Sequence, residues 1–310
     1  MKRSACTCAS MTTGGDLLIP GSFDYVSAQS LPEAIALLGQ YGDDAKILAG
    51  GHSLIPLLRY RLAAPAVLID INRIDGLAYM QETDGMLHIG ALTREADLDR
   101  SPLIRNRYPI LYDTARNIAD PVVRNWATVG GNLAHADPAN DHPATMLALG
   151  ASVVAEGPAG PRVIPIDEFF TDVTFETTLQ PGEILTEIRI PAPTERSGGA
   201  YLKLERKVGD YAIAGVAAYV QLDANGLVTS AGIGLTNVGP APIKARAAEQ
   251  ALLGKPLDEQ SIRAAADLAE AASQPTSDTR GPAEYKRAMV HTLCTRALRK
   301  AAERAQGGAA

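Results

Sequence analysis

The chain has 310 residues, of which 46% are hydrophobic and 21% are charged, and its formal net charge at pH 7 is −6. This length and composition are typical of a soluble globular protein with one large domain or two moderate ones, and the acidic balance argues against a nucleic-acid-binding protein. No apolar run reaches the roughly 18 residues that a membrane-spanning helix needs, so we expect no transmembrane segment.

The first 19 residues predict a disordered leader. Lys2 and Arg3 are not followed by the apolar segment of a signal peptide, so we expect a cytoplasmic protein, either free or associated peripherally with the inner face of the membrane. The cysteines are Cys6, Cys8 and Cys294, too few for a disulfide framework or a four-thiolate iron–sulfur cluster. Redox chemistry in this chain would therefore need a cofactor that cysteines do not hold.

Hydrophobic periodicity and the positions of Gly and Pro predict helices and strands from residue 20 onward. In chain order we expect a helix at 32–41, strands at 46–49, 67–71 and 87–92, helices at 102–117 and 143–149, and strands at 152–155, 162–166 and 184–190. Residues 191–199 (PAPTERSGG) are rich in Pro, Gly and Ser, which is typical of a linker.

Beyond this linker the pattern predicts a three-stranded antiparallel sheet followed by helices. We expect strands at 200–207, 213–222 and 228–235, and helices at 244–253, 257–272 and 283–305. The chain as a whole is therefore predicted to be an α+β protein in two parts, one at residues 20–192 and a smaller one at 198–305.

Two glycine-rich segments carry the strongest chemical signal. In KILAGGHSLIP (46–56), Gly50 and Gly51 directly follow a predicted strand, and TVGGNLAHADPAND (128–141) repeats the pattern with Gly130 and Gly131. Glycine allows a backbone turn with positive φ, and successive free N–H groups in such a turn bind anions. One such segment is more often a plain tight turn, but two in one chain favour a pyrophosphate, which has two phosphates to bind.

Several alternatives remain open from the residues alone. Neither segment fits G-x-G-x-x-G or G-x-x-x-x-G-K-[ST], which argues against a Rossmann dinucleotide site and against an NTPase. We interpret His52 and His135 as loop histidines, because no set of His, Cys and carboxylate residues has metal-ligand spacing. The carboxylates Asp120, Asp137 and Asp141 are chemically suited either to a divalent cation or to ribose or ribityl hydroxyls.

Taken together, AGGHSLIP (49–56), TVGGN (128–132) with its ADPAND tail, and YLKLERKVGDYA (201–212) resemble the FAD-binding medium subunits of molybdenum hydroxylases. The resemblance covers the chain from Pro20 to Tyr285 and favours the branch of the family that contains the aerobic carbon monoxide dehydrogenases. It implies an N-terminal FAD-binding domain of two α+β lobes followed by a small C-terminal domain, with the leader outside the shared pattern.

The resemblance also implies which residues bind FAD. The pyrophosphate would be bound by backbone N–H groups of both segments, with Lys46 near the adenosine end and Asp141 accepting ribityl hydroxyls. Leu185 matches an apolar residue that lines the cofactor, although a core position explains it equally well. Lys203 matches a lysine near the flavin, and Tyr211 an aromatic residue that lies against the isoalloxazine or, alternatively, packs at a strand end. The residues of the two segments are Ala49, Gly50, Gly51, His52, Ser53 and Leu54 in the first, and Thr128, Val129, Gly130, Gly131 and Asn132 in the second.

In this family the medium subunit works with two partners, and this chain is expected to have no catalytic or metal-binding residues of its own. A large subunit holds the molybdenum cofactor, and a small one holds two [2Fe–2S] clusters. Electrons would pass through the FAD of this chain to an external acceptor such as a quinone, within a dimer of heterotrimers. The substrate would be carbon monoxide, or alternatively an N-heterocycle or another small compound. An autonomous flavin oxidase is a further alternative, although we find no clear catalytic base or covalent flavin link.

Overall fold

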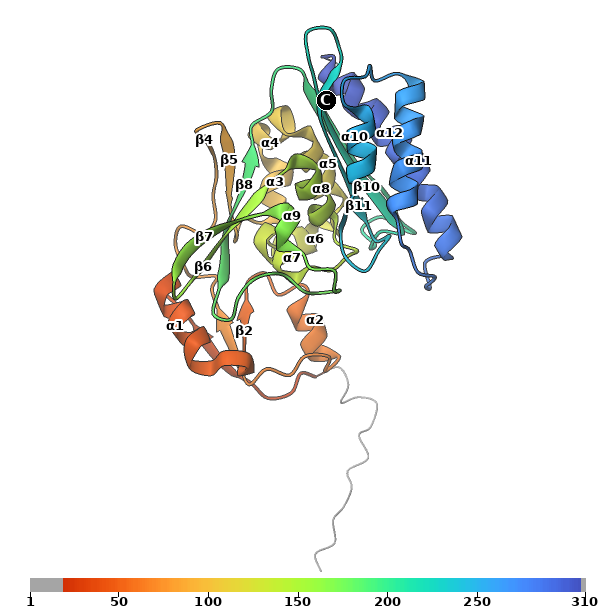
Figure 1. The fold of residues 1–310 in the computed structure, drawn as a ribbon. Helices are drawn as coiled ribbons and strands as arrows, with labels where there is room; N and C mark the ends of the chain where they lie inside the picture. The colour runs from red at the N-terminus through yellow and green to blue at the C-terminus, as the bar shows by residue number, and fades with distance from the viewer. Residues whose placement is uncertain (1–18, 308–310) are drawn as a thin grey trace, which may run out of the picture.

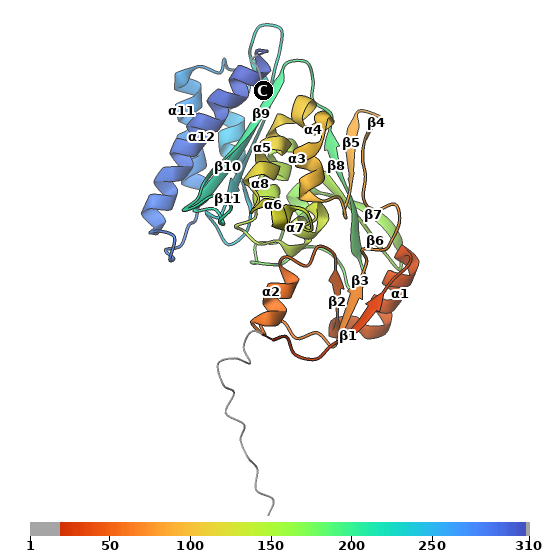
Figure 2. The same cartoon turned by 180° about the vertical axis from the view of Figure 1, so that it is seen from behind.

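The structure, a computed structural model, describes residues 19–307, and these form three sheets with surrounding helices (Figure 1). The predicted leader lies outside the described residues, apart from Ile19. Figures 1 and 2 show a small N-terminal lobe at one end of the molecule and the C-terminal helices at the other, with a middle lobe between them.

The N-terminal lobe is built on a parallel sheet in the order β1-β3-β2. Its central strand β3 is buried along its whole length, as expected for a strand covered on both faces. Because the strands are parallel, the residues that follow β2 and those that follow β3 lie at the same edge of the sheet. The elements of this lobe are β1 (Asp24–Ser27), α1 (Leu31–Tyr41), a 3-10 turn (Gly42–Asp44), β2 (Ala45–Leu48), α2 (Leu54–Arg59) and β3 (Val67–Asp70).

The middle lobe has a five-stranded antiparallel sheet in the order β4-β5-β8-β6-β7, with helices against it. Most of these helices are short, and α7 lies on the side that faces the N-terminal lobe (Figure 2). The strands are β4 (Met80–Thr83), β5 (Met86–Gly90), β6 (Ser152–Gly157), β7 (Gly160–Pro165) and β8 (Ile184–Pro191). The helices are α3 (Glu95–Arg100), α4 (Pro102–Arg107), α5 (Pro109–Asn117), α6 (Pro121–Arg124), α7 (Val129–His135), α8 (Asp141–Leu149) and α9 (Ile166–Phe169).

The C-terminal domain is an antiparallel sheet in the order β12-β11-β10-β9. Helix α12 packs on β9 and β10 and α10 on β11, whereas α5 and α8 of the middle lobe pack on the same sheet from the first part of the chain. The elements are β9 (Ser197–Leu204), β10 (Ala214–Leu222), β11 (Val228–Thr236), β12 (Ile243–Lys244), α10 (Arg246–Leu252), α11 (Glu259–Ala272) and α12 (Ala283–Ala305).

Glycines let α8 approach this sheet unusually closely. A Cβ atom added at Gly232 would lie 1.9 Å from the carbonyl oxygen of Ala148, and one at Gly234 would lie 2.0 Å from that of Ala144. No other residue type would fit against the helix backbone at either position. The contact holds the N-terminus of α8, where Asp141 lies, against the side chains of the C-terminal sheet.

The α+β class and the two-lobed first part followed by a small C-terminal domain are confirmed, with several corrections. The C-terminal sheet has a fourth, two-residue strand, β12, beside the three that were predicted. The helix expected at 102–117 is broken at Tyr108, because Pro109 cannot continue the preceding helix. The linker is shorter than predicted, since β8 runs through Pro191 and β9 begins at Ser197. Among the described residues, no helix is both long and apolar enough to span a membrane.

Candidate functional site

The first glycine segment presents a row of unpaired backbone donors. It connects β2 to α2, and Gly51 adopts a φ of +76°, which a glycine adopts without strain. Within residues 19–307, none of the N–H groups from Gly50 to Leu54 donates a hydrogen bond to a protein acceptor. Five consecutive free N–H groups around a left-handed glycine form a concavity suited to an anion.

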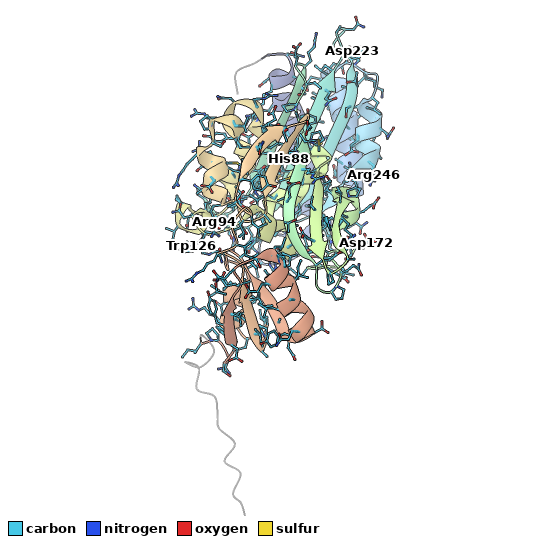
Figure 3. The ribbon with its side chains drawn as sticks, turned by 90° about the vertical axis from the view of Figure 1, so that its left-hand side faces the viewer. His88, Arg94, Trp126, Asp172, Asp223 and Arg246 are labelled. Carbon is cyan, nitrogen blue, oxygen red and sulfur yellow. The ribbon has the colours of Figure 1, made fainter. Side chains whose placement is uncertain are left out.

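Asn72 and Arg94 fix the position of this segment through the carbonyl group of Ala49. Asn72 follows β3 and donates from Nδ2 to the carbonyl oxygen of Ala49 (2.8 Å), while its Oδ1 accepts from Arg94 Nη2 (2.7 Å). Arg94 also donates from Nη1 to the carbonyl oxygen of Trp126 (2.6 Å), and its guanidinium lies 5.6 Å from the Trp126 ring centroid. Figure 3 shows Arg94 and Trp126 side by side next to the N-terminal lobe. The sequence interpretation did not identify Asn72 or Arg94 as part of the site.

Asp70, the last residue of β3, fixes Asn72 in turn. Its Oδ1 accepts from the backbone N–H of Asn72 (2.8 Å) and from Asn72 Nδ2 (2.6 Å), and its Oδ2 accepts from the Tyr25 hydroxyl. Burial alone would raise the pKa of the Asp70 carboxyl, but the hydrogen bonds from Tyr25 and Asn72 outweigh it and lower that pKa. Asp70 therefore stays ionised and acts as a fixed acceptor.

The second glycine segment was predicted to be a turn with free backbone N–H groups. In the structure it is instead the first turn of helix α7. Thr128 caps the helix, and its Oγ1 accepts from Gly131 N (3.1 Å). The N–H groups of Val129 and Gly130 donate to the carbonyl oxygens of Thr93 and Ala91 (both 3.0 Å), and that of Asn132 donates to Thr128 O (2.9 Å). These amides already have protein acceptors. Among the residues that the structure describes, the buried Oδ1 of Asn132 in this segment has no hydrogen-bond partner.

The two segments, far apart in the sequence, form one cradle. A Cβ atom at Gly50 would lie 2.3 Å from Trp126 O and 2.9 Å from Ala127 Cα, so the first segment rests directly on the residues before α7. On the other side, a Cβ atom at Gly131 would lie 4.0 Å from Ala49 Cβ. The absence of a side chain at Gly50 therefore allows a contact that any larger residue would block, and Gly131 lies within ordinary packing distance of the first segment.

A buried cluster of charged and polar side chains joins the first residue of α8 to β9. Tyr201 and Lys203 lie on the same face of the strand because they are two residues apart. The Tyr201 hydroxyl donates to Asp141 Oδ1 (2.5 Å), and Lys203 Nζ donates to Asp141 Oδ2 (3.1 Å). Burial raises the pKa of Asp141 despite the nearby Lys203 ammonium. Burial and the Asp141 charge raise the pKa of Tyr201 well above its usual value, so its hydroxyl remains a donor.

The Lys203 ammonium is fully engaged by the protein. Besides Asp141, it donates to the carbonyl oxygens of Asn117 (2.5 Å) and Asp210 (3.1 Å), and it lies 3.3 Å from Glu205 Oε2. Its side chain is only 1% exposed. An ammonium has three N–H donors, and all three are used here. Lys203 can therefore act on a bound ligand through its charge, without a direct hydrogen bond.

The other predicted residues fall into distinct environments. Lys46 and His52, which belong to the first segment, are exposed. Tyr211 is 44% exposed, and partial burial with the nearby Asp137 carboxylate raises the pKa of its hydroxyl. Leu185 is buried in the core of the middle lobe, as the core interpretation predicts.

The three carboxylates that were considered as possible cation ligands each accept hydrogen bonds from a different part of the protein. Asp120 caps α6 by accepting from Val123 N (2.9 Å), Asp137 accepts from Ala139 N (2.9 Å), and Asp141 binds Tyr201 and Lys203. Within the described part of the chain, no group of three or more His, Cys, Asp and Glu side chains is arranged to hold a metal ion.

Two known domain families match this chain. Residues 21–193 match the family described as the FAD binding domain in molybdopterin dehydrogenase, and residues 199–301 match the CO dehydrogenase flavoprotein C-terminal domain. Both glycine segments and Asp141 lie in the first match, and Lys203 and Tyr211 lie in the second.

The chain is also similar over most of its length to individual proteins. It is 46% identical to the carbon monoxide dehydrogenase medium chain of Hydrogenophaga pseudoflava, over 92% of this chain and 98% of that protein. It is 42% identical to the 6-hydroxypseudooxynicotine dehydrogenase complex subunit alpha of Paenarthrobacter nicotinovorans, over 93% and 97%. Its fold matches a solved carbon monoxide dehydrogenase chain from Hydrogenophaga pseudoflava with a TM-score of 0.89 and 49% identity, covering 91% of this chain and 98% of that one.

The contact between the two segments predicts a large difference between two glycine substitutions. Gly50→Ala places a methyl group against the Trp126 carbonyl and should lower the free energy of unfolding by about 1–3 kcal/mol. Gly39→Ala is the matched control, because its Cβ meets no atom within 4 Å in helix α1 and should be neutral or slightly stabilising. Thermal unfolding measures both, and equal melting temperatures for the two variants would contradict the cradle.

Proposed function

This chain belongs to the family of FAD-binding medium subunits of molybdenum hydroxylases, and from that premise we propose that it relays electrons from the iron–sulfur clusters of a partner subunit, through FAD, to an external acceptor. The observation that carries the proposal is the row of free N–H groups from Gly50 to Leu54. When bound, FAD supplies two-electron redox chemistry, and the protein supplies binding, orientation and electrostatics.

The residues of the cradle fit the polar parts of FAD. In our proposal the N–H groups of Gly50 to Leu54 bind pyrophosphate oxygens, while α7 acts as the opposite wall. The buried Oδ1 of Asn132 has no protein donor and so suits a ligand hydroxyl. The proposal thus assigns most of the backbone contacts to the first segment, because the amides of the second are already paired within the protein.

The cluster around Asp141 fits the middle of the cofactor. Each carboxylate oxygen can accept more than one hydrogen bond, so Asp141 retains acceptor capacity for a ribityl hydroxyl beside its bonds to Tyr201 and Lys203. Lys203 contributes a buried positive charge close to the same place, which favours a reduced, negatively charged flavin. Tyr211, whose ring is partly exposed, is proposed to lie against the isoalloxazine, and Lys46 to lie near the adenosine end.

We propose a complex with a large molybdenum-cofactor subunit and a small subunit that holds two [2Fe–2S] clusters, as a dimer of heterotrimers. Similarity to carbon monoxide dehydrogenase medium chains favours carbon monoxide as the substrate. The acceptor that we propose is a quinone. The 42% identity to a subunit of a 6-hydroxypseudooxynicotine dehydrogenase supports an N-heterocyclic compound as the second candidate. The substrate would be bound by the large subunit, so residues of this chain do not distinguish the two.

Purification of this chain from its native host tests the assembly. We expect two further polypeptides to co-purify, one larger and one smaller, together with flavin, iron and molybdenum. The absorbance spectrum and metal analysis check this directly. A yellow protein without iron or molybdenum would contradict the relay and point to an autonomous flavin oxidase, and a colourless one would remove the cofactor as well.

A pair of substitutions at Gly51 isolates the electrostatic part of FAD binding. Gly51→Asp and Gly51→Asn impose nearly the same steric demand, mainly against the end of the Ile55 side chain, and the same strained positive φ. Only the aspartate adds a negative charge beside the proposed pyrophosphate. We expect the Asp variant of the complex to lose its flavin and the Asn variant to retain most of it, measured as flavin per complex. Equal flavin content in both variants would place the phosphates elsewhere.

A further inference from the structure

Arg280 of the C-terminal domain contacts the residue that is proposed to face the flavin. Its guanidinium carbon lies 5.6 Å from the centroid of the Tyr211 ring, and its Nη2 donates to Asp210 Oδ1 (3.3 Å). We propose that Arg280 is a positioning residue, which fixes the Tyr211 ring for contact with the isoalloxazine of FAD. This inference deepens the function proposed above and rests on it.

Asp210 is held by three groups besides Arg280. The Asp210 carboxylate accepts from Arg206 Nε (3.0 Å) and from the backbone N–H of Tyr211 (2.9 Å), and its carbonyl oxygen accepts from Lys203 Nζ (3.1 Å). By contrast, the Tyr211 hydroxyl makes no hydrogen bond within residues 19–307, and the residue is 44% exposed. We infer that the cation–π contact with Arg280 restrains the ring.

An ion pair between the buried Lys286 ammonium and the more exposed Asp278 carboxylate sets the position of Arg280. Arg280 lies in the turn before α12, where Asp278 accepts from the backbone N–H of Arg280 (2.8 Å) and from Lys286 Nζ (2.7 Å). The Lys286 side chain projects from α12 and is only 2% exposed. Loss of Asp278 would leave the Lys286 ammonium buried without this partner, which is costly, so the turn is held against the helix. Helix α12 thereby determines where the guanidinium lies, and through it the orientation of Tyr211.

The position of Arg280 also determines which face of the Tyr211 ring would contact the flavin in our proposal. A guanidinium prefers the negative face of an aromatic ring, and Arg280 covers one face of Tyr211 in this way. In our proposal the opposite face of the ring contacts the planar, electron-poor isoalloxazine. The C-terminal domain would thus take part in flavin binding without contacting the phosphates.

Four variants of the assembled complex test the inference: Arg280→Gln, Arg280→Lys, Tyr211→Ala and the double variant Arg280→Gln/Tyr211→Ala. The readouts are the Kd for FAD, from titration of the deflavinated complex, and the flavin absorbance spectrum. We expect Arg280→Gln to weaken FAD binding about two- to fivefold, the equivalent of an exposed cation–π contact, and to change the spectrum in the same direction as Tyr211→Ala. Arg280→Lys keeps the charge without the planar contact and should restore part of the affinity.

The double variant separates positioning from a general loss of stability. If Arg280 acts through Tyr211, its loss should add nothing once the ring is gone, so the double variant should bind FAD like Tyr211→Ala. Arg299→Gln is the matched control, because Arg299 lies on α12 and pairs with Glu259, and it should behave like the parent.

The outcomes distinguish this inference from the function on which it rests. Parental FAD binding and spectrum for Arg280→Gln, with altered values for Tyr211→Ala, would overturn the role of Arg280 and leave the flavin site in place. Additive effects in the double variant would also overturn it. If Tyr211→Ala had the Kd for FAD and the absorbance spectrum of the parent, the Tyr211 ring would not contact the flavin, and the inference would fall. Absence of flavin from the parent complex would instead contradict the proposed function itself.

Discussion

The five consecutive backbone N–H groups from Gly50 to Leu54, which have no acceptor among residues 19–307, are the constraint around which the rest of the site is arranged. Unpaired backbone donors are costly unless water or a ligand satisfies them. The chain keeps them unpaired by binding the carbonyl side of the same segment, through Asn72, while Arg94 ties Asn72 to the Trp126 carbonyl. The donors are thus directed outward in a preorganised conformation, which reduces the ordering cost when an anion binds.

The glycines of this protein serve two different physical purposes. Gly51 supplies a positive φ, which lets the segment turn out of β2. At Gly50 and Gly130, and likewise at Gly232 and Gly234, the missing side chain instead allows backbones to approach closely. The last two hold α8 on the C-terminal sheet and so bring Asp141 to Tyr201 and Lys203. The proposed phosphate site and the buried polar cluster therefore both depend on backbone packing.

The sequence predicted much of the fold, and its misses have identifiable causes. The helix at 283–305 was predicted at its observed bounds because it is long and contains neither Gly nor Pro. The second glycine segment was interpreted as a turn, although Thr128 followed by Gly131 is also compatible with a capped helix. Asn72, Arg94 and Tyr201 could not be found from the sequence alone, since their roles depend on contacts between residues far apart in the chain. The predicted roles of the individual FAD-binding residues stay predictions.

Amide hydrogen exchange of the assembled complex, with and without FAD, tests the central claim most directly. The account predicts that FAD slows exchange of the amides from Gly50 to Leu54, which have no protein acceptor, and leaves those from Val129 to Asn132 nearly unchanged, because they are already paired. Protection confined to the second segment, with none in the first, would contradict the account and show that the phosphates are bound by the N-terminus of α7.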